Sequence, residues 1–349
     1  MLNVKAELER VFGGARAIAT MVFDDGLRES AKQINALCKK HSCRASLMLC
    51  SGIRIDTTLD MWRELFSEGY LHPESHSHLH KYLTRSHPEN LTEEIMTDEI
   101  EGSFERLNKL LPGYDILTFG LPYGSYASPA MEHLYKCAYA VRAGNCVLAD
   151  ERARGKMQSL DPVMNREEMG SWYNMIGIRM MPEKCRVYPM ITPEALIEYL
   201  DKCVESGGWF LSTAHGIVEG ENLDITVGDL DRIMQRMEEH TRAGNLWVTS
   251  FTDATKYVRE RQSSCLELAP DSDNVKLTLK MQDKTADGLP LDGSVFNMPL
   301  TVRLTLPEGA KGAELCYGEK REYLDAFDLC GAPTVRFDML PNTAALLKL

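Results

Sequence analysis

The sequence predicts an α/β protein in which a distorted (β/α) barrel of about seven strands is followed by a small antiparallel β-sandwich. Up to about residue 262, short apolar runs that end in polar turns alternate with helical stretches, which is typical of parallel βαβ units. After that point, apolar and polar residues alternate at every second position, as in half-buried antiparallel strands. The 349 residues also exceed the ~250 of a single α/β barrel, so a second unit is expected.

The predicted barrel elements follow one another between residues 17 and 261. Strands are expected at 17–23, 44–50, 70–75, 115–119, 138–142, 209–213 and 246–250, and helices at 29–40, 58–68, 92–110, 129–136, 193–206, 227–243 and 252–261. The helix over 92–110 is the clearest, because Glu93 and Glu94 stand near the positive end of its dipole and Pro112-Gly113 ends it. About seven strand–helix pairs favour a barrel over an open sheet.

The C-terminal part is predicted to contain strands at 275–281, 300–306 and 334–339. We therefore expect two domains, a barrel over 1–262 and an accessory β-sandwich over 263–349.

Composition and charge exclude several classes of protein. With 44% hydrophobic and 26% charged residues, the chain has the balance of a soluble globular protein. The 39 basic and 51 acidic residues give a net charge of −12, which disfavours nucleic acid or an anionic membrane as a partner. The ten cysteines form no C-x-x-C pair and are interpreted as mostly reduced thiols.

The first 19 residues carry charged side chains and no long apolar stretch. Neither a signal peptide nor a membrane span is therefore predicted. The protein is expected to be cytoplasmic as written, or secreted if the sequence is a trimmed form. The oligomeric state stays open.

Two adjacent carboxylates stand where the first predicted barrel strand ends. Asp24-Asp25-Gly26 follows the apolar run 17–23, at the carboxyl end of a strand, where parallel α/β proteins build their sites. Such a pair is costly to bury unless a cation or a shared proton compensates its charge. Because Asp-Gly is also ordinary turn chemistry, the segment alone leaves an exposed turn open.

A second segment supplies a pair of histidines. His76 and His80 are four residues apart, which brings both rings to one face of a helical turn and suits zinc. Two imidazole nitrogens and one carboxylate oxygen would form a three-ligand catalytic site with a fourth position open for water. His72 and His78 are expected to lie outside this ligand set.

Two further segments are weaker on their own. Pro122-Tyr123-Gly124 follows the predicted strand 115–119, and His215 follows the predicted strand 209–213. The first is compatible with a simple turn and the second with a structural histidine.

Taken in order and spacing, the four segments resemble the motifs of the polysaccharide deacetylase family, the NodB-homology domain of carbohydrate esterase family 4. The first motif is matched by Asp24-Asp25, the H-S/T-x-x-H motif by 76–80, the P-Y-G segment by 122–124, and the late histidine by His215. The resemblance covers about residues 15 to 262 and implies a NodB-like barrel.

The resemblance also implies a role for each matched residue. It assigns the binding of a divalent metal to Asp25, His76 and His80. Zn²⁺ is expected there, with Co²⁺, Ni²⁺ or Mn²⁺ as alternatives. It makes Asp24 the general base and His215 the general acid, and it places the backbone N–H of Tyr123 at the oxyanion. Spacing alone leaves open which of the two aspartates is ligand and which is base.

The chain departs from the family pattern beside the base. Gly120 stands where the family usually has the arginine that steadies the catalytic aspartate. Arg142 and Arg166 are candidates to replace it, or the base is tuned differently.

The substrate-binding motifs also depart from the pattern. The motif in which an Asp and a Trp line the groove has no firm match, and Trp172 is its candidate, with Pro122 and Tyr123 as the other candidate substrate-binding residues. Thr213 and Gly216 replace a frequent Leu and Asp around the late histidine.

The sequence thus predicts a metal-dependent hydrolase that removes N-acetyl groups, or alternatively O-acetyl groups, from an oligo- or polysaccharide by attack of a metal-bound water. The barrel over 1–262 is then the catalytic domain. For the sandwich a scaffold or lid is expected, with sugar binding or dimerisation as the alternative, and its aromatic residues form no recognisable sugar platform.

One alternative keeps the fold and hydrolyses another non-peptide C–N bond, which a profile of released products would detect. Another alternative is a glycan-binding protein without catalysis. Glycan binding alone would not need all five polar residues of the motifs, so their presence argues against this alternative. They are Asp24, Asp25, His76, His80 and His215.

Overall fold

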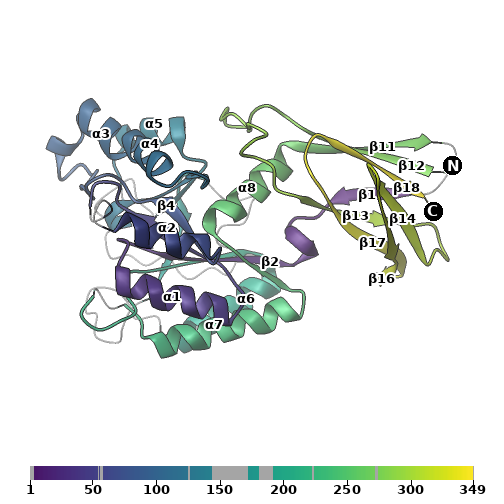
Figure 1. The fold of residues 1–349 in the computed structure, drawn as a ribbon, viewed down its shortest axis with the longest axis horizontal. Coiled ribbons are helices and arrows are strands. Elements are labelled where there is room, and N and C mark those ends of the chain that lie inside the picture. Colours follow the sequence, from purple (N-terminus) through teal and green to yellow (C-terminus); the bar gives the residue numbers. More distant parts are fainter. Residues whose placement is uncertain are drawn as a thin grey trace. The chain divides into compact units, whose positions relative to one another are not determined.

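The computed structural model describes residues 4–53, 55, 58–124, 126–143, 172–180, 192–221, 224–271 and 274–348. The chain divides into two compact units, one formed by Arg16–Thr255 and the other by Met1–Ala15 together with Lys256–Leu349 (Figure 1). The described helices include none that is both long and apolar enough to cross a membrane. The eight cysteines among these residues are free thiols, and Cys146 and Cys185 lie outside the described residues.

The unit Arg16–Thr255 is built around a parallel sheet with the strand order β7-β6-β5-β4-β3-β2-β9-β8, on which β10 pairs with β2. The bounds are β2 Ala17–Phe23, β3 Ala45–Leu49, β4 Leu71–Ser75, β5 Thr118–Gly120, β6 Ala140–Ala143, β7 Met175–Ile176, β8 Ile178–Arg179, β9 Trp209–Ala214 and β10 Leu246–Val248. The two outermost strands, β7 and β8, are separated in the chain by Gly177 alone. Both edges of the sheet are therefore joined at one short segment, and the predicted barrel is confirmed.

Helices follow most of these strands in the chain. Helix α1 lies beside α7 (Figure 1). Their bounds are α1 Arg28–Lys40, α2 Leu59–Ser67, α3 Glu93–Glu99, α4 Glu101–Leu110, α5 Ser128–Cys137, α6 Pro193–Ser206, α7 Val227–Arg242 and α8 Phe251–Gln262, with short 3-10 turns η1 Phe12–Gly14, η2 Pro88–Asn90 and η3 Pro122–Gly124. Thr192 caps α6 by accepting from the Ala195 N–H at 3.2 Å, and Gly207 ends it in a left-handed conformation. Local capping thus explains why this helix has its predicted bounds.

The single helix predicted over 92–110 is two helices, α3 and α4. The break falls at Ile100, whose backbone angles are φ −101° and ψ −79°. The Ser103 hydroxyl donates to the Ile100 carbonyl at 2.6 Å and lies 2.7 Å from the Ser75 hydroxyl at the end of β4. A side chain that bonds to the backbone in this way competes with regular helix geometry. The break thus coincides with these contacts of Ser103, while the sequence pattern on both sides of it is helical.

The core of the barrel unit separates into an apolar and a polar side of the strands. Leu47 and Leu49 belong to the same buried apolar cluster as Trp62 and Phe66 of α2. Ser46 directly precedes Leu47, so its side chain points to the opposite face of β3, where its hydroxyl donates to the buried carboxylate of Glu74 at 3.0 Å. The Glu74 carboxylate also accepts from the Thr252 N–H at 3.1 Å, and so caps the first turn of α8.

The second unit contains two antiparallel sheets with the orders β1-β13-β17-β16 and β11-β12-β18-β14-β15. The bounds are β1 Lys5–Leu8, β11 Ser264–Asp271, β12 Asn274–Met281, β13 Leu300–Thr305, β14 Gly312–Tyr317, β15 Lys320–Asp325, β16 Phe327–Leu329, β17 Ala332–Met339 and β18 Thr343–Lys348. Strands β14 and β15 of one sheet contact β17 of the other. Buried side chains alternate along their strands, such as Leu277 and Leu279 on β12. The expected sandwich after the barrel is confirmed.

The N-terminus differs from the predicted division of the chain at residue 262. Residues 1–15 were expected in the barrel domain, but β1 pairs antiparallel with β13, with Lys5 opposite Thr305 and Leu8 opposite Val302. The Tyr257 hydroxyl donates to the Glu9 carbonyl at 2.9 Å within the same unit. Strand pairing between residues nearly 300 positions apart leaves no local signal, which is why the sequence pattern missed it.

Candidate metal and catalytic site

The candidate site lies where parallel strands end. Asp24 and Asp25 follow β2, His76 follows β4, Tyr123 follows β5 and His215 follows β9. Because these strands run parallel in one barrel, their carboxyl ends meet at the same face. The topology therefore brings together segments that are up to 190 residues apart in the chain, as the Asp25–His215 approach of 4.0 Å illustrates.

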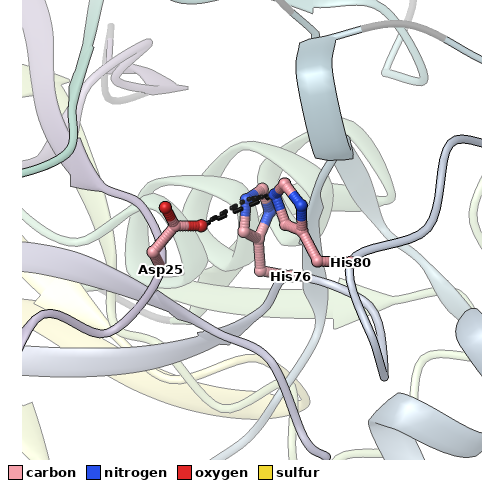
Figure 2. A group of neighbouring side chains, drawn as sticks. All are labelled: Asp25, His76 and His80. Carbon is pink, nitrogen blue, oxygen red and sulfur yellow. Dashed lines mark hydrogen bonds and ion pairs between the residues drawn. The ribbon is translucent and has the colours of Figure 1, made fainter. Parts of the chain in front are cut away.

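Three potential ligands converge in this region. The Asp25 Oδ1 atom lies 3.7 Å from His76 Nε2 and 3.5 Å from His80 Nε2, and the two Nε2 atoms are 3.2 Å apart. Figure 2 shows the carboxylate facing both rings. Ligands at ~2.0–2.1 Å from a tetrahedral zinc ion are ~3.3 Å from one another, so these separations fit one cation. Within the described residues, Asp25, His76 and His80 thus form a group of neighbouring carboxylate and histidine side chains that could hold a metal ion.

The hydrogen bond of His76 leaves one ring nitrogen available as a ligand. Its Nδ1–H donates to the Gly120 carbonyl at 2.8 Å, so Nε2 carries the lone pair that faces Asp25 and His80. Burial, together with the nearby Arg142 and His80 charges, lowers the pKa of His76 to about 4. The imidazole is therefore neutral at physiological pH, as a metal ligand must be.

The backbone at the site is strained at several residues other than glycine. Asp25, Ser77, His80 and Tyr123 have φ values of 69°, 68°, 57° and 58°. Left-handed conformations of such residues cost free energy and persist only where surrounding contacts impose them. Asp25 and His80 thus have left-handed backbone conformations, and their side chains face each other with His80 Nε2 3.5 Å from Asp25 Oδ1.

Asp24 forms a buried ion pair with Arg142. The Arg142 Nη2 atom lies 2.6 Å from Asp24 Oδ1, and the Thr213 hydroxyl donates to Oδ2 at 3.3 Å. Burial raises the pKa of the Asp24 carboxyl, but the charges of Arg142, His76 and His215 outweigh it and lower the pKa below its ordinary value. The residue is therefore ionised and able to accept a proton.

The position of Arg142 explains the glycine at 120. Gly120 and Arg142 are register partners on the adjacent strands β5 and β6. A Cβ atom at Gly120 would lie 2.6 Å from Arg142 Nη2, and one at Gly177 would lie 2.9 Å from Arg142 Cδ. The guanidinium thus occupies the space that two glycines leave open. Arg142 is the arginine that pairs with Asp24, whereas Arg166 lies outside the described residues.

His215 is held by a carboxylate that the sequence motifs did not include. Its Nδ1–H donates to Asp224 Oδ2 at 2.7 Å, and its backbone N–H donates to the same oxygen at 2.9 Å. Arg179 Nη2 lies 3.2 Å from Asp224 Oδ1. Burial lowers the pKa of His215, but the hydrogen bond to Asp224 and the Asp24 charge outweigh it and raise the pKa above its ordinary value. Asp224 belongs to no recognisable motif, so only the fold could reveal it.

Replacing Asp224 by asparagine is expected to shift the alkaline limb of the kcat/KM profile to lower pH. If His215 acts as an acid, activity falls as pH rises through its pKa, and loss of the Asp224 charge lowers that pKa. At neutral pH, kcat/KM should fall by about tenfold or more, because a smaller fraction of His215 is protonated and its ring is less well oriented. An unchanged alkaline limb, measured by acetate release across pH, would contradict this role for the pair.

The three candidate substrate-binding residues are not placed together. Tyr123 is 46% exposed and its ring lies 4.6 Å from that of His80, measured between centroids, and Pro122 is buried beside it in η3. Trp172 instead packs against Trp209, the first residue of β9, with ring centroids 6.3 Å apart. Tyr123 and Pro122 thus lie beside His80, whereas the ring contact given for Trp172 is with the first residue of β9.

Fold and site together define a class: a nearly closed parallel barrel with an Asp-His-His group of metal-binding type beside a second carboxylate at the carboxyl ends of its strands. Residues 14–141 match the family model described as polysaccharide deacetylase. This part of the chain carries both the aspartate and the histidine motifs. The predicted resemblance to the polysaccharide deacetylase family is therefore confirmed over these residues.

The chain is also similar to solved structures at low sequence identity. One is the Xyl-CE4 domain of a multidomain xylanase from the hindgut metagenome of Trinervitermes trinervoides, with 11% identity, a TM-score of 0.43, and coverage of 68% of this chain and 88% of that one. Another is the peptidoglycan deacetylase PdaC from Bacillus subtilis, with 14% identity, a TM-score of 0.40, and coverage of 68% and 89%. A third is a CE4 family pseudoenzyme from Bacillus anthracis, with 13% identity, a TM-score of 0.44, and coverage of 68% and 65%. No curated protein matches the sequence.

Proposed function

We propose that this protein is a metal-dependent hydrolase that removes acetyl groups from an oligo- or polysaccharide. The observation that carries the proposal is the convergence of Asp25, His76 and His80 within ligand distance of one another, beside an ionised Asp24. The family supports a carbohydrate deacetylase, and the metal and substrate are inferred from the site.

The donor set fits a divalent metal, and we propose Zn²⁺, with Co²⁺, Ni²⁺ or Mn²⁺ as alternatives. Two neutral imidazole nitrogens and one carboxylate oxygen are a common catalytic zinc set. Two ring nitrogens 3.2 Å apart also need a shared proton or a cation between them. When bound, such a metal lowers the pKa of a coordinated water and polarises the carbonyl that is attacked.

In this proposal, Asp24 accepts the proton of the attacking water. Its pKa is lowered by Arg142, so the carboxylate is ionised before the reaction begins, and Thr213 fixes its second oxygen. His215 would then donate a proton to the leaving nitrogen or oxygen as the bond to the acetyl carbon breaks. Asp224 accepts a hydrogen bond from the His215 Nδ1–H, and this bond and the Asp224 charge favour the protonated form of the ring.

The oxyanion that forms on the acetyl group would be stabilised by the backbone N–H of Tyr123 in addition to the metal. Tyr123 directly follows the buried Pro122 in η3, and its positive φ of 58° fixes the direction of this segment. Loss of one such donor typically raises a barrier by ~3 kcal/mol. Because an amine leaving group needs a proton more than an alkoxide does, the protonated His215 favours N-acetyl over O-acetyl substrates.

Two other functions fit parts of this arrangement. A hydrolase of a different non-peptide C–N bond would use the same residues, and the absence of the family arginine at position 120 leaves this alternative open. A glycan-binding protein without catalysis would not need both the Asp24–Arg142 pair and the His215–Asp224 pair. We propose that the β-sandwich unit is accessory, as a scaffold or lid, or alternatively for sugar binding or dimerisation.

The test measures acetate released from acetylated chitooligosaccharides and acetylated xylan, with and without a chelator. We expect release that the chelator abolishes and Zn²⁺ restores. His76→Ala should lose both bound metal and activity. The matched control is His78→Gln, which removes an imidazole of the same loop. His78 Nδ1 lies 2.9 Å from the Ser51 hydroxyl, and the glutamine amide offers that hydroxyl a polar partner in its place. Ammonia or a ring-opened product in place of acetate would favour the hydrolase of another C–N bond. Binding of the saccharide without any product would favour the glycan-binding protein.

A further inference from the structure

The loop that carries the second histidine ligand is held by a buried carboxylate outside the motifs. Glu99, the last residue of α3, is fully buried. Its Oε1 and Oε2 atoms accept from the Leu79 N–H at 3.1 and 3.0 Å, and Oε2 accepts from the Lys81 N–H at 3.4 Å. Every hydrogen bond that the described structure gives to this carboxylate comes from residues on either side of His80.

The loop needs such a partner because its backbone is strained. Ser77 and His80 both have positive φ values, 68° and 57°, although neither is glycine. From one side, the loop is bonded to the chain after β3, where the Ser51 and Gly52 N–H groups donate to the Ser77 and His78 carbonyls at 3.0 and 2.9 Å. These bonds engage backbone carbonyls that precede His80. The backbone N–H groups of the two residues that flank His80 donate to Glu99 instead.

A buried carboxylate is costly unless donors satisfy it, and backbone N–H groups do so with strong, charge-assisted hydrogen bonds. The buried Glu99 carboxylate keeps these hydrogen bonds only while residues 79–81 have their present conformation, so any other loop conformation would leave a buried charge without donors. This is the conformation in which His80 Nε2 lies 3.5 Å from Asp25 Oδ1 and 3.2 Å from His76 Nε2.

We propose that Glu99 is a positioning residue for the metal site, which holds the His80 imidazole toward Asp25 and His76 through the backbone of the loop. The proposal rests on the metal site of the proposed function. It predicts that Glu99 affects metal affinity and coordination geometry, although the side chain is not itself a ligand.

The experiment measures the Kd of the full-length protein for Co²⁺ and the visible absorption spectrum of the bound ion. For Glu99→Gln we expect the Kd to rise by about 10- to 100-fold, which is the usual effect of losing an outer partner of a metal ligand, and the spectrum to change. Glu99→Asp keeps the charge on a shorter side chain and should give an intermediate Kd. The matched control is Glu101→Gln, because Glu101 bonds to His133 Nδ1 at 2.9 Å and not to the loop.

A second variant pair tests whether the effect passes through His80. In a His80→Ala background, Glu99→Gln should no longer weaken Co²⁺ binding, because the ligand that Glu99 positions is gone. An equal weakening in both backgrounds, or an equal loss in Glu101→Gln, would show a general effect on stability and overturn the proposal. If Glu99→Gln does not fold, Glu99→Asp decides: wild-type affinity and spectrum reject the proposal.

The same data separate this inference from the proposed function. Failure of the wild-type protein to bind Co²⁺, or binding that is insensitive to His76→Ala, would remove the metal site itself. Binding that depends on His76 and His80 but not on Glu99 would remove only the positioning role.

Discussion

Replacing Asp24 by asparagine is expected to lower kcat by about 10²- to 10⁴-fold while the metal content stays at the wild-type level. The asparagine amide is nearly isosteric but cannot accept the proton of the attacking water. Metal binding should persist because the Asp24 oxygens are engaged by Arg142 and Thr213 and are not part of the Asp25, His76 and His80 group. The measurement pairs acetate release with metal analysis of the same sample.

The control for this prediction must account for the charge left on Arg142. Asp24→Asn removes the partner of a guanidinium whose side chain is 3% exposed, so some loss of stability is expected. The double variant Asp24→Asn/Arg142→Met removes both charges and should recover stability without recovering activity. Near-wild-type turnover in either variant would exclude Asp24 as the general base.

Replacing Arg142 by methionine is expected to lower the free energy of unfolding by about 3–5 kcal/mol at neutral pH, because it leaves the buried Asp24 carboxylate without its partner. At present the lowered pKa of Asp24 means that its ionised form stabilises the fold above the pKa of the unfolded chain, and that this stabilisation is lost as pH falls. Without Arg142, burial dominates and raises the pKa. The loss of stability should then be largest at neutral pH and smaller in acid.

The same substitution should move the acid limb of the kcat/KM profile to higher pH, because Asp24 must be ionised to act as a base. Denaturant unfolding at several pH values and the pH–rate profile check the two effects. Arg44→Met is the matched control, since the Arg44–Asp253 pair is partly exposed and is expected to contribute about 0–1 kcal/mol. An acid limb and a stability equal to those of the wild type would contradict the assigned role of Arg142.

Local sequence patterns predicted most elements of the barrel, although not β7, β8 or the break between α3 and α4, and the family resemblance supplied the candidate ligand group. Apolar runs and helical periods depend on neighbours a few residues apart, so helix α6 and strand β2 have their predicted bounds. The ends of parallel strands share one face of a barrel, so the aspartate and histidine motifs could be placed together before any coordinates.

Contacts between distant segments could be identified only in the folded chain. Arg142 reaches Asp24 across 118 positions, Asp224 holds His215 from a segment without a motif, and β1 joins β13. Trp172, which the sequence pattern suggested for substrate binding, packs against Trp209 at the start of β9. Strand register and the packing of side chains across a barrel depend on the whole chain, whereas periodicity and capping are local, so the sequence pattern reveals only the latter.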